Sequence, residues 1–315
     1  MAAVTVIANP LAEKRDKVLL FQSSDATGSL RVEPRHLETL EFKLALGAVD
    51  AGSVPRPLAN PSQLVSMVYK DTVAVYGITG KNDADLQLTM VSPVYHKIKV
   101  KPVSGALAGC ALKTGGMKGE KGWLYVLFND GGETKLGEWE LSSSAVNKHT
   151  LNADKLSTST QLHAVFDEIS KKRWVVYQNT DNEVVILDAE RNKGFTIDDT
   201  DRVAAKTPLA LAIVPNIAEP KKRRLVTYFL AKSGKATNVL HFANTSLEYK
   251  DPSWEEVEEK PRPVPGINVL LPWAQIDTYV DENKKRTLVF GLQTKTEGEE
   301  PLFNVIDHVW TSLED

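Results

Sequence analysis

Polar side chains stand at the start of several short apolar segments. Two segments open with Gln161-Leu-His163 and Gln275-Ile-Asp277, and a third opens with Gln63. Glutamine amides and a protonated imidazole can donate hydrogen bonds to a carbonyl oxygen that gains negative charge in a transition state. An imidazole beside a carboxylate can carry positive charge, so we expect an ion pair or a water-bridged contact between His163 and Asp277.

Trp273 lies two residues before Gln275 and offers a flat apolar wall for a ligand, although packing between sheets explains this tryptophan equally well. The structural alternative for the other side chains is that they hold ordered water in a channel. The chemical hypothesis assigns catalysis to His163, Gln161 and Gln275, and substrate binding to Gln63, Trp273 and Asp277.

Other catalytic templates are missing from the sequence. It has no Gly-x-x-x-x-Gly-Lys phosphate loop, no Gly-x-Ser-x-Gly elbow and no His-Glu-x-x-His metal helix. The histidines are too scattered for a metal site, and the single cysteine, Cys110, has no neighbouring base. We therefore expect no metal and no other cofactor. An enzymatic function then narrows to reactions with little proton transfer, of which a pericyclic cycloaddition is one.

The charge balance argues against several kinds of partner. The 315 residues are 42% hydrophobic and 25% charged, with a formal net charge of -3. Nucleic acid and anionic lipid need clustered Lys and Arg, whereas each dense basic run here precedes an apolar strand, as turn charges would. No apolar stretch approaches the ~18 residues of a membrane span, and no secretory signal is visible. We expect a cytoplasmic protein with small-molecule ligands, and a homodimer stays open.

A strand that ends in an aromatic residue recurs six times, and turn residues and another strand follow each copy. The copies are Val18–Phe21, Val73–Tyr76, Tyr125–Phe128, Trp174–Tyr177, Leu225–Tyr228 and Thr287–Phe290. A short apolar strand precedes each copy, and a weaker fourth strand is expected at 42–46, 97–103 and 254–257. Units of three or four strands at intervals of about 40 to 65 residues predict an all-β fold, a six-bladed β-propeller with about four antiparallel strands per blade.

We expect a single propeller domain over residues 1–315, with blades near 1–58, 59–103, 104–155, 156–203, 204–260 and 261–315. The first strand of each blade should border the central channel, whose mouth is the usual ligand position. Two rings of residues then line that mouth. The first ring is Ala3, Gln63, Ala106, Gln161, Pro208 and Gln275, and the second is Thr5, Val65, Ala108, His163, Ala210 and Asp277.

The hairpin Arg173-Trp-Val-Val-Tyr-Gln178, with Asn179–Asn182 and Glu183–Asp188, resembles a blade of the fungal fucose-specific lectins, which are six-bladed propellers of this size. The resemblance implies sugar sites between blades, each with an arginine on the second strand, a glutamate on the third and an aromatic platform. The arginine position here holds Val18, Val73, Tyr125, Trp174, Leu225 and Thr287, and the glutamate position holds Val32 and Ile186 where it can be placed. The charge-assisted hydrogen bonds to a sugar are then missing.

The scaffold also resembles that of the fungal hetero-Diels-Alderases of tropolone-sesquiterpenoid biosynthesis, intracellular proteins that couple a quinone methide to a cyclic polyene. A multivalent lectin would repeat its polar residues in every blade, whereas the polar residues of the two rings are unequal. The sequence therefore favours a cofactor-free pericyclic coupling of apolar molecules at the channel mouth, in fungal secondary metabolism. The alternative is a glycan-binding lectin or a non-catalytic ligand-binding propeller.

Overall fold

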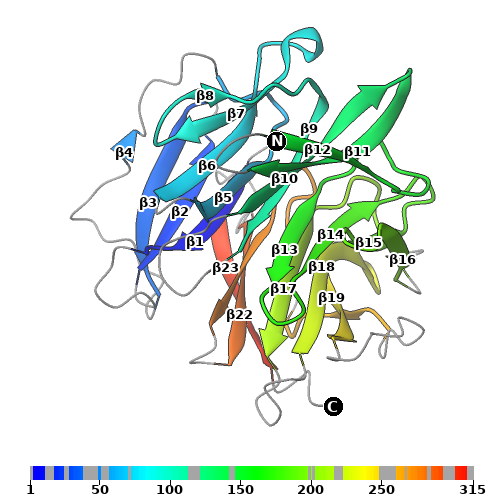
Figure 1. Cartoon of the computed structure of the whole chain (residues 1–315). Coiled ribbons are helices and arrows are strands. Elements are labelled where there is room, and N and C mark those ends of the chain that lie inside the picture. The colour runs from blue at the N-terminus through cyan, green and yellow to red at the C-terminus, as the bar shows by residue number, and fades with distance from the viewer. Residues whose placement is uncertain are drawn as a thin grey trace. The chain divides into compact units, whose positions relative to one another are not determined.

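Six antiparallel sheets follow one another along the chain, and in the part of the chain that the structure describes a short 3₁₀ helix, η2 (Asp83–Asp85), lies between two of their strands (Figure 1). The computed structural model describes residues 3–10, 18–24, 28–37, 49–50, 57–69, 72–112, 121–141, 146–197, 200, 203–215, 223–247, 260–266, 268–281, 285–293 and 302–310. The sheets have three or four strands each, so the predicted six-bladed β-propeller is confirmed. Two compact units, Met1–Leu151 and Asn152–Asp315, hold three blades each.

The first unit contains blades 1 to 3, in which strands adjacent in the chain pair with each other. Blade 1 has β1 (Val4–Ala8), β2 (Val18–Ser24), β3 (Leu30–His36) and β4 (Val49–Asp50). Blade 2 has β5 (Leu64–Tyr69), β6 (Thr72–Thr79), β7 (Gln87–Ser92) and β8 (His96–Lys97). Blade 3 has β9 (Pro102–Ala111), β10 (Gly122–Asp130), β11 (Glu133–Leu141) and β12 (Val146–Leu151).

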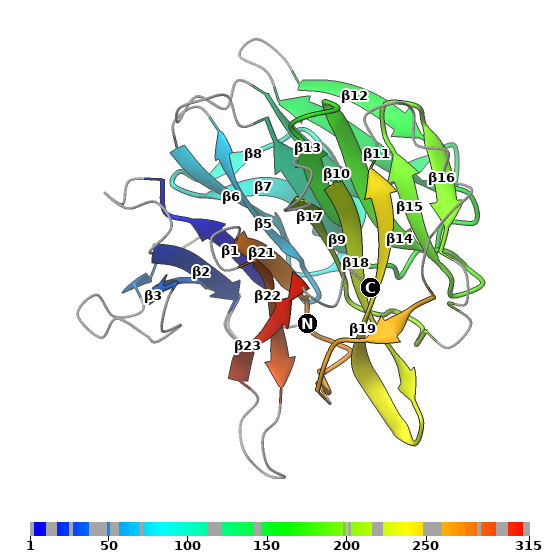
Figure 2. The same cartoon turned by 90° about the horizontal axis from the view of Figure 1, so that it is seen from below.

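The second unit contains blades 4 to 6. Blade 4 has β13 (His163–Asp167), β14 (Lys172–Gln178), β15 (Val184–Asp188) and β16 (Lys193–Thr196). Blade 5 has β17 (Leu209–Pro215), β18 (Arg223–Ser233), β19 (Ala236–Leu247) and β20 (Arg262–Pro263). Blade 6 has β21 (Asp277–Asp281), β22 (Arg286–Gln293) and β23 (Leu302–Val309). The long β18–β19 hairpin is the yellow arm in Figure 2.

The core lies between neighbouring blades, which explains why the second strand of each blade is so apolar. Each predicted aromatic-ended copy falls inside a second strand, namely β2, β6, β10, β14, β18 or β22. Trp174 of blade 4 packs in one cluster with Leu225 and Phe229 of blade 5. The opposite face of blade 5 packs Tyr228 in a cluster with Val289 of blade 6. Such a strand is buried on both faces, so it is apolar at successive residues rather than at alternate ones.

The six aromatic-ended copies do not share one strand register. In blades 2, 5 and 6 the final aromatic, Tyr76, Tyr228 or Phe290, pairs with the second-ring residue of its own blade. In blade 4, by contrast, His163 pairs with Val176, so Tyr177 is displaced by one residue. Hydrogen bonding between strands sets this register, and an alignment on the aromatic residues alone misses it.

The fourth strands differ from the sequence prediction. In blade 2 the fourth strand is β8, and Pro102 and Val103 of the predicted 97–103 segment already belong to β9 of blade 3. In blade 5 it is β20, beyond the expected blade limit at 260, with Arg262 opposite Phe242. The prolines beside Arg262 thus flank or occupy an edge strand, where a missing N–H breaks no ladder bond. The segments 42–46 and 254–257 lie outside the described residues.

Candidate binding site at the inner strands

Within each unit, the first strand of a blade lies beside the first strand of the next blade. In the first unit β5 lies between β1 and β9, and in the second unit β17 lies between β13 and β21. Each of these inner strands pairs along one edge only, with the second strand of its own blade. The backbone groups on the other edge must find partners elsewhere, because a buried unpaired N–H is costly.

In the first unit, Gln63 supplies such a partner. Its side chain is fully buried, and Oε1 accepts a hydrogen bond from the backbone N–H of Leu107 in β9 at 3.2 Å. One blade earlier, Thr5 Oγ1 accepts the backbone N–H of Ser66 in β5 at 3.0 Å. These hydrogen bonds join consecutive inner strands, so the predicted substrate-binding amide of Gln63 is engaged in holding blade 2 to blade 3.

In the second unit, the side chain of His163 joins blade 4 to blade 5. Its Nδ1 accepts the backbone N–H of Leu211 in β17 at 3.1 Å, and its Nε2 lies 2.9 Å from Asp277 Oδ1 in β21. A backbone N–H can only donate, so Nδ1 must keep its lone pair and the proton must sit on Nε2, which donates to Asp277. The expected contact between His163 and Asp277 is therefore present, but this geometry requires a neutral imidazole instead of a charged donor.

Two further contacts tie blade 6 to its neighbours. Gln161 Nε2 reaches the Ala274 carbonyl oxygen at 3.5 Å, and Thr278 Oγ1 donates to the Leu211 carbonyl oxygen at 2.7 Å. Gln161 and Gln275 are each 2% exposed, so neither predicted catalytic amide is open to solvent. The structure thus joins His163 to Asp277, while Gln161 makes a separate contact with the connector before blade 6.

Hydroxyl side chains just before three inner strands hold the first and second strands of a blade together, and the sequence motifs above do not include them. Ser62, Thr160 and Thr207 each accept a backbone N–H from the second strand of the same blade, at 2.7 to 3.0 Å. Each hydroxyl also donates to the carbonyl of the next residue. Their signal in the sequence is a Ser or Thr immediately before the first-ring residue.

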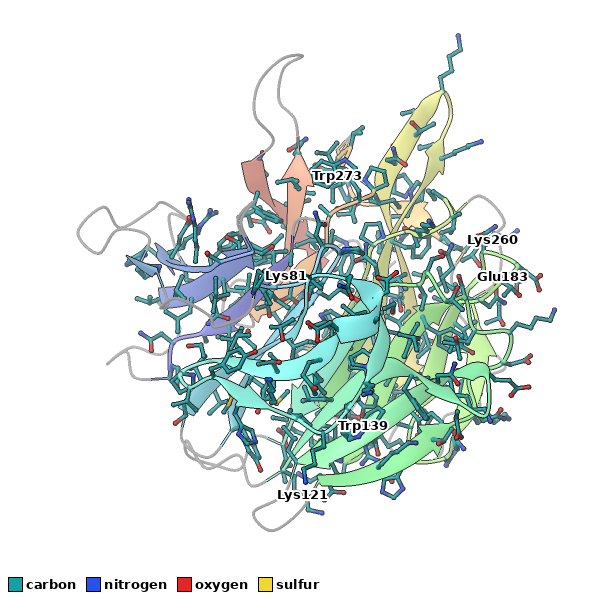
Figure 3. The ribbon with its side chains drawn as sticks, turned by 90° about the horizontal axis from the view of Figure 1, so that it is seen from above. Lys81, Lys121, Trp139, Glu183, Lys260 and Trp273 are labelled. Carbon is teal, nitrogen blue, oxygen red and sulfur yellow. The ribbon has the colours of Figure 1, made fainter. Side chains whose placement is uncertain are left out.

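Trp273 differs from every other tryptophan in the described part of the chain. It is 49% exposed, on the connector that leads into β21, whereas Trp174 is fully buried. Figure 3 labels it near the faintly coloured strands of blade 6. Packing between sheets therefore leaves about half of this side chain in contact with solvent.

The described residues contain no cluster of three or more His, Cys, Asp or Glu side chains that could hold a metal ion. Cys110 is buried. No helix in the same residues is long and apolar enough to cross a membrane.

Substitution can distinguish a side chain that stabilises the fold, as we expect for His163, from an exposed one that does not, as we expect for Trp273. His163→Ala should lower the free energy of unfolding by about 1–3 kcal/mol, because it removes one hydrogen-bond partner from the Leu211 N–H and one from the Asp277 carboxylate. Trp273→Ala should change it by no more than about 0.5 kcal/mol, because the indole is largely in solvent. Urea denaturation of both variants measures these changes in the free energy of unfolding. Equal stability in both would contradict a structural role for His163.

Solved structures of fungal lectins share this architecture. The Aleuria aurantia lectin in complex with α-methyl-L-fucoside superimposes with a TM-score of 0.64, at 12% identity, over 98% of this chain and 95% of that chain. The SapL1 lectin in complex with α-methyl fucoside gives 0.63 at 13% identity, over 98% and 96% of the two chains. AofleA from Arthrobotrys oligospora gives 0.61 at 12% identity, over 98% and 87%.

This similarity confirms the class of fold, an all-β six-bladed propeller, and at such low identity it shows the fold alone. No protein-family model matches the sequence, and no curated protein matches it either.

Proposed function

We propose that this protein is a lectin-type propeller that binds a small carbohydrate without converting it. The observation that carries the proposal is the similarity over almost the whole chain to two lectins solved with a methyl fucoside. The hydrogen bonds of Gln63 and His163 support it, because side chains already engaged between blades are poorly placed to activate a substrate carbonyl.

A charged residue on the second strand of blade 4 supports the proposal. The sequence alignment places the lectin arginine three residues before the final aromatic of the second strand. Counted from Val176, the strand partner of His163, this position in blade 4 is Arg173 instead of Trp174. Arg173 pairs with Glu190, whose side chain is 46% exposed. The Arg173 side chain is only 11% exposed, so its guanidinium would act from beneath the exposed Glu190 carboxylate. A guanidinium and a carboxylate can make the charge-assisted hydrogen bonds that hold a sugar hydroxyl.

A glycan array and a titration with α-methyl-L-fucoside test the proposal. We expect at least one class of glycan to bind. Arg173→Lys should weaken that binding about tenfold or more, because lysine lacks the planar fork of the guanidinium. Lys155→Ala is the matched control, since its ion pair with Asp181 is exposed on both sides and lies outside the proposed site.

Two outcomes would overturn this assignment at different levels. An array without any bound glycan would remove the lectin function. Binding that survives Arg173→Lys but is lost in Trp273→Ala would keep the lectin and move its site to the exposed indole.

Pericyclic coupling is the second candidate, and the exposed Trp273 beside the first-ring residue Gln275 favours it. A flat indole wall can hold a diene and a dienophile in a reactive geometry. The test is incubation with a quinone methide and a cyclic polyene. Enantiomeric excess in the product, lost in Trp273→Ala, would support catalysis, whereas a racemic product at the uncatalysed rate would exclude it.

A further inference from the structure

The β18–β19 hairpin extends beyond the other strands of blade 5. β17 pairs with β18 only as far as Phe229, and β20 pairs with β19 only at His241 and Phe242. The outer part of the hairpin, residues 230–239, is flanked instead by the connectors that lead into blades 5 and 6. This part is the yellow arm of Figure 2, and Figure 3 shows it with its side chains. The surface of the arm thus combines a hairpin of blade 5 with a connector of blade 6.

Backbone hydrogen bonds fix the connector to blade 6 along the β19 edge of the arm. The Leu270 N–H donates to the Asn238 carbonyl oxygen at 3.1 Å, and Val269 pairs with Val239 in an isolated bridge. The position of the connector beside the arm is therefore set by pairing between backbones, as in an additional short strand.

Trp273 lies in the tight turn that follows. The Ala274 N–H donates to the Leu271 carbonyl oxygen at 3.2 Å, so Pro272 and Trp273 are the two central residues of a β-turn. The Leu271 N–H donates to the Leu292 carbonyl oxygen at 2.9 Å, which holds the turn against blade 6. Proline at the first central position restricts the backbone further. The indole is thus carried by a preformed turn.

Two exposed apolar side chains lie on this connector. Val269 is 40% exposed and Trp273 is 49% exposed. The other exposed large apolar side chains of the described residues, Val94, Ile169 and Val309, lie on three separate elements or turns. Single exposed apolar residues are ordinary on a protein surface, whereas neighbouring ones indicate an interaction site. The connector is therefore a candidate contact surface.

The charge on the arm is positive. Lys232 and Lys235 are exposed near its free end, and neither forms an ion pair with a described residue. Residues 228–240 and 268–274 include no Asp and no Glu. Ala231, next to Lys232, pairs with Val239, which pairs with the connector. Two strand spacings then place the Lys232 backbone about 10 Å from the connector.

These features suit an extended ligand with apolar faces and negative charge. The C–H groups on one face of a sugar ring carry partial positive charge, so they pack against the negative face of an indole. Carboxylate or sulfate groups on neighbouring sugars would pair with the two lysines. A membrane, by contrast, takes up apolar side chains that leave the protein surface. Val269 and Trp273 are each covered by protein over half or more of their surface.

We propose that Trp273, Lys232 and Lys235 form a binding surface for an acidic polysaccharide, whose sugars carry carboxylate or sulfate groups. The indole packs against one sugar ring, and the lysines contact the charged groups of its neighbours. The surface shares no residue with the site proposed at Arg173 in blade 4. It goes beyond the function proposed above and does not require that a fucoside bind.

Titration of the full chain with polygalacturonate, dextran sulfate and uncharged dextran tests the proposal. We expect at least one acidic polymer to bind and dextran to fail, and the two acidic polymers separate carboxylate from sulfate recognition. Lys232→Ala combined with Lys235→Ala should weaken binding about tenfold at an ionic strength below about 50 mM. Added salt should reduce this difference, because it screens exposed charges.

Trp273→Ala should weaken the same binding about five- to tenfold, and Trp273→Tyr should retain most of it because an aromatic face remains. Lys81→Ala combined with Lys99→Ala is the matched control. Both of these lysines are exposed in the first unit, and their loss removes the same amount of charge. Binding by this control should equal that of the unsubstituted protein.

The absence of binding to both acidic polymers would overturn the proposal, as would an equal loss of binding in the control. Polyadenylate and phosphatidylserine vesicles are the competing probes. If either binds as tightly as the acidic polysaccharides and Trp273→Ala does not weaken them, the surface recognises negative charge alone and the carbohydrate assignment is wrong. The titration with α-methyl-L-fucoside reports separately on the site at Arg173, so the failure of one proposal is distinguishable from the failure of the other.

Discussion

Arg223→Met should lower the free energy of unfolding by about 3–5 kcal/mol, because it strands a buried carboxylate without its charge partner. Arg223 of β18 forms an ion pair with Asp167 at the end of β13, and these side chains are 5% and 1% exposed. Asp167 is held in place by the backbone N–H of Ile169 at 3.1 Å and the Ser170 hydroxyl at 2.5 Å. It therefore cannot turn to solvent when Arg223 is lost.

Urea denaturation measures this loss, and Lys155→Met is the control. The ion pair of Lys155 with Asp181 has side chains that are 59% and 51% exposed, so its removal should leave the denaturation midpoint unchanged. Arg223→Met combined with Asp167→Leu should recover most of the loss, because the pair is replaced by apolar side chains. A single variant as stable as the control would show that this ion pair does not hold blade 4 to blade 5.

Gly105→Ala should destabilise the contact between blades 2 and 3 by on the order of 3 kcal/mol. A Cβ at Gly105 would lie 1.9 Å from the Pro61 carbonyl oxygen and 2.5 Å from its carbon, which are backbone atoms with little freedom to move. The Gly105 carbonyl accepts the Gln63 N–H at 2.8 Å. The two strands cannot separate without losing that bond and the one from Leu107 to Gln63.

Thermal denaturation, with hydrogen exchange at the Leu107 amide, checks this prediction. Gly194→Ala is the matched control, because the nearest atom to its new Cβ would be a Val185 methyl group at 3.2 Å and Gly194 lies on the exposed strand β16. It should shift stability by less than about 1 kcal/mol. Unchanged protection of Leu107 in Gly105→Ala would mean that the inner strands tolerate a wider spacing than the structure shows.

The repeat could be read from the sequence because it depends on local pattern. A second strand packed on both faces needs apolar residues in succession, and Trp174–Tyr177 meets that need within four residues. Weak outer strands could not be located in the same way. The two residues of β20 owe their place to pairing with Phe242 and His241, and their own sequence, Arg262-Pro263, resembles a loop.

The polar residues of the inner strands were also visible in the sequence, and the pairing of His163 with Asp277 could be expected from their positions in the repeat. What could not be expected was the third partner. The Leu211 N–H lies 48 residues from His163 and is a backbone group, which every residue but proline has. No side-chain pattern marks it.

The amino-acid sequence by itself therefore determined the number of blades, the apolar second strands and the identity of the polar residues on the inner strands, because burial selects residue types locally. The tertiary structure alone decided the register that pairs His163 with Val176 and Phe166 with Arg173, and the partners of Gln63 and His163. Those depend on hydrogen-bonding groups of neighbouring blades, which meet only when the sheets pack.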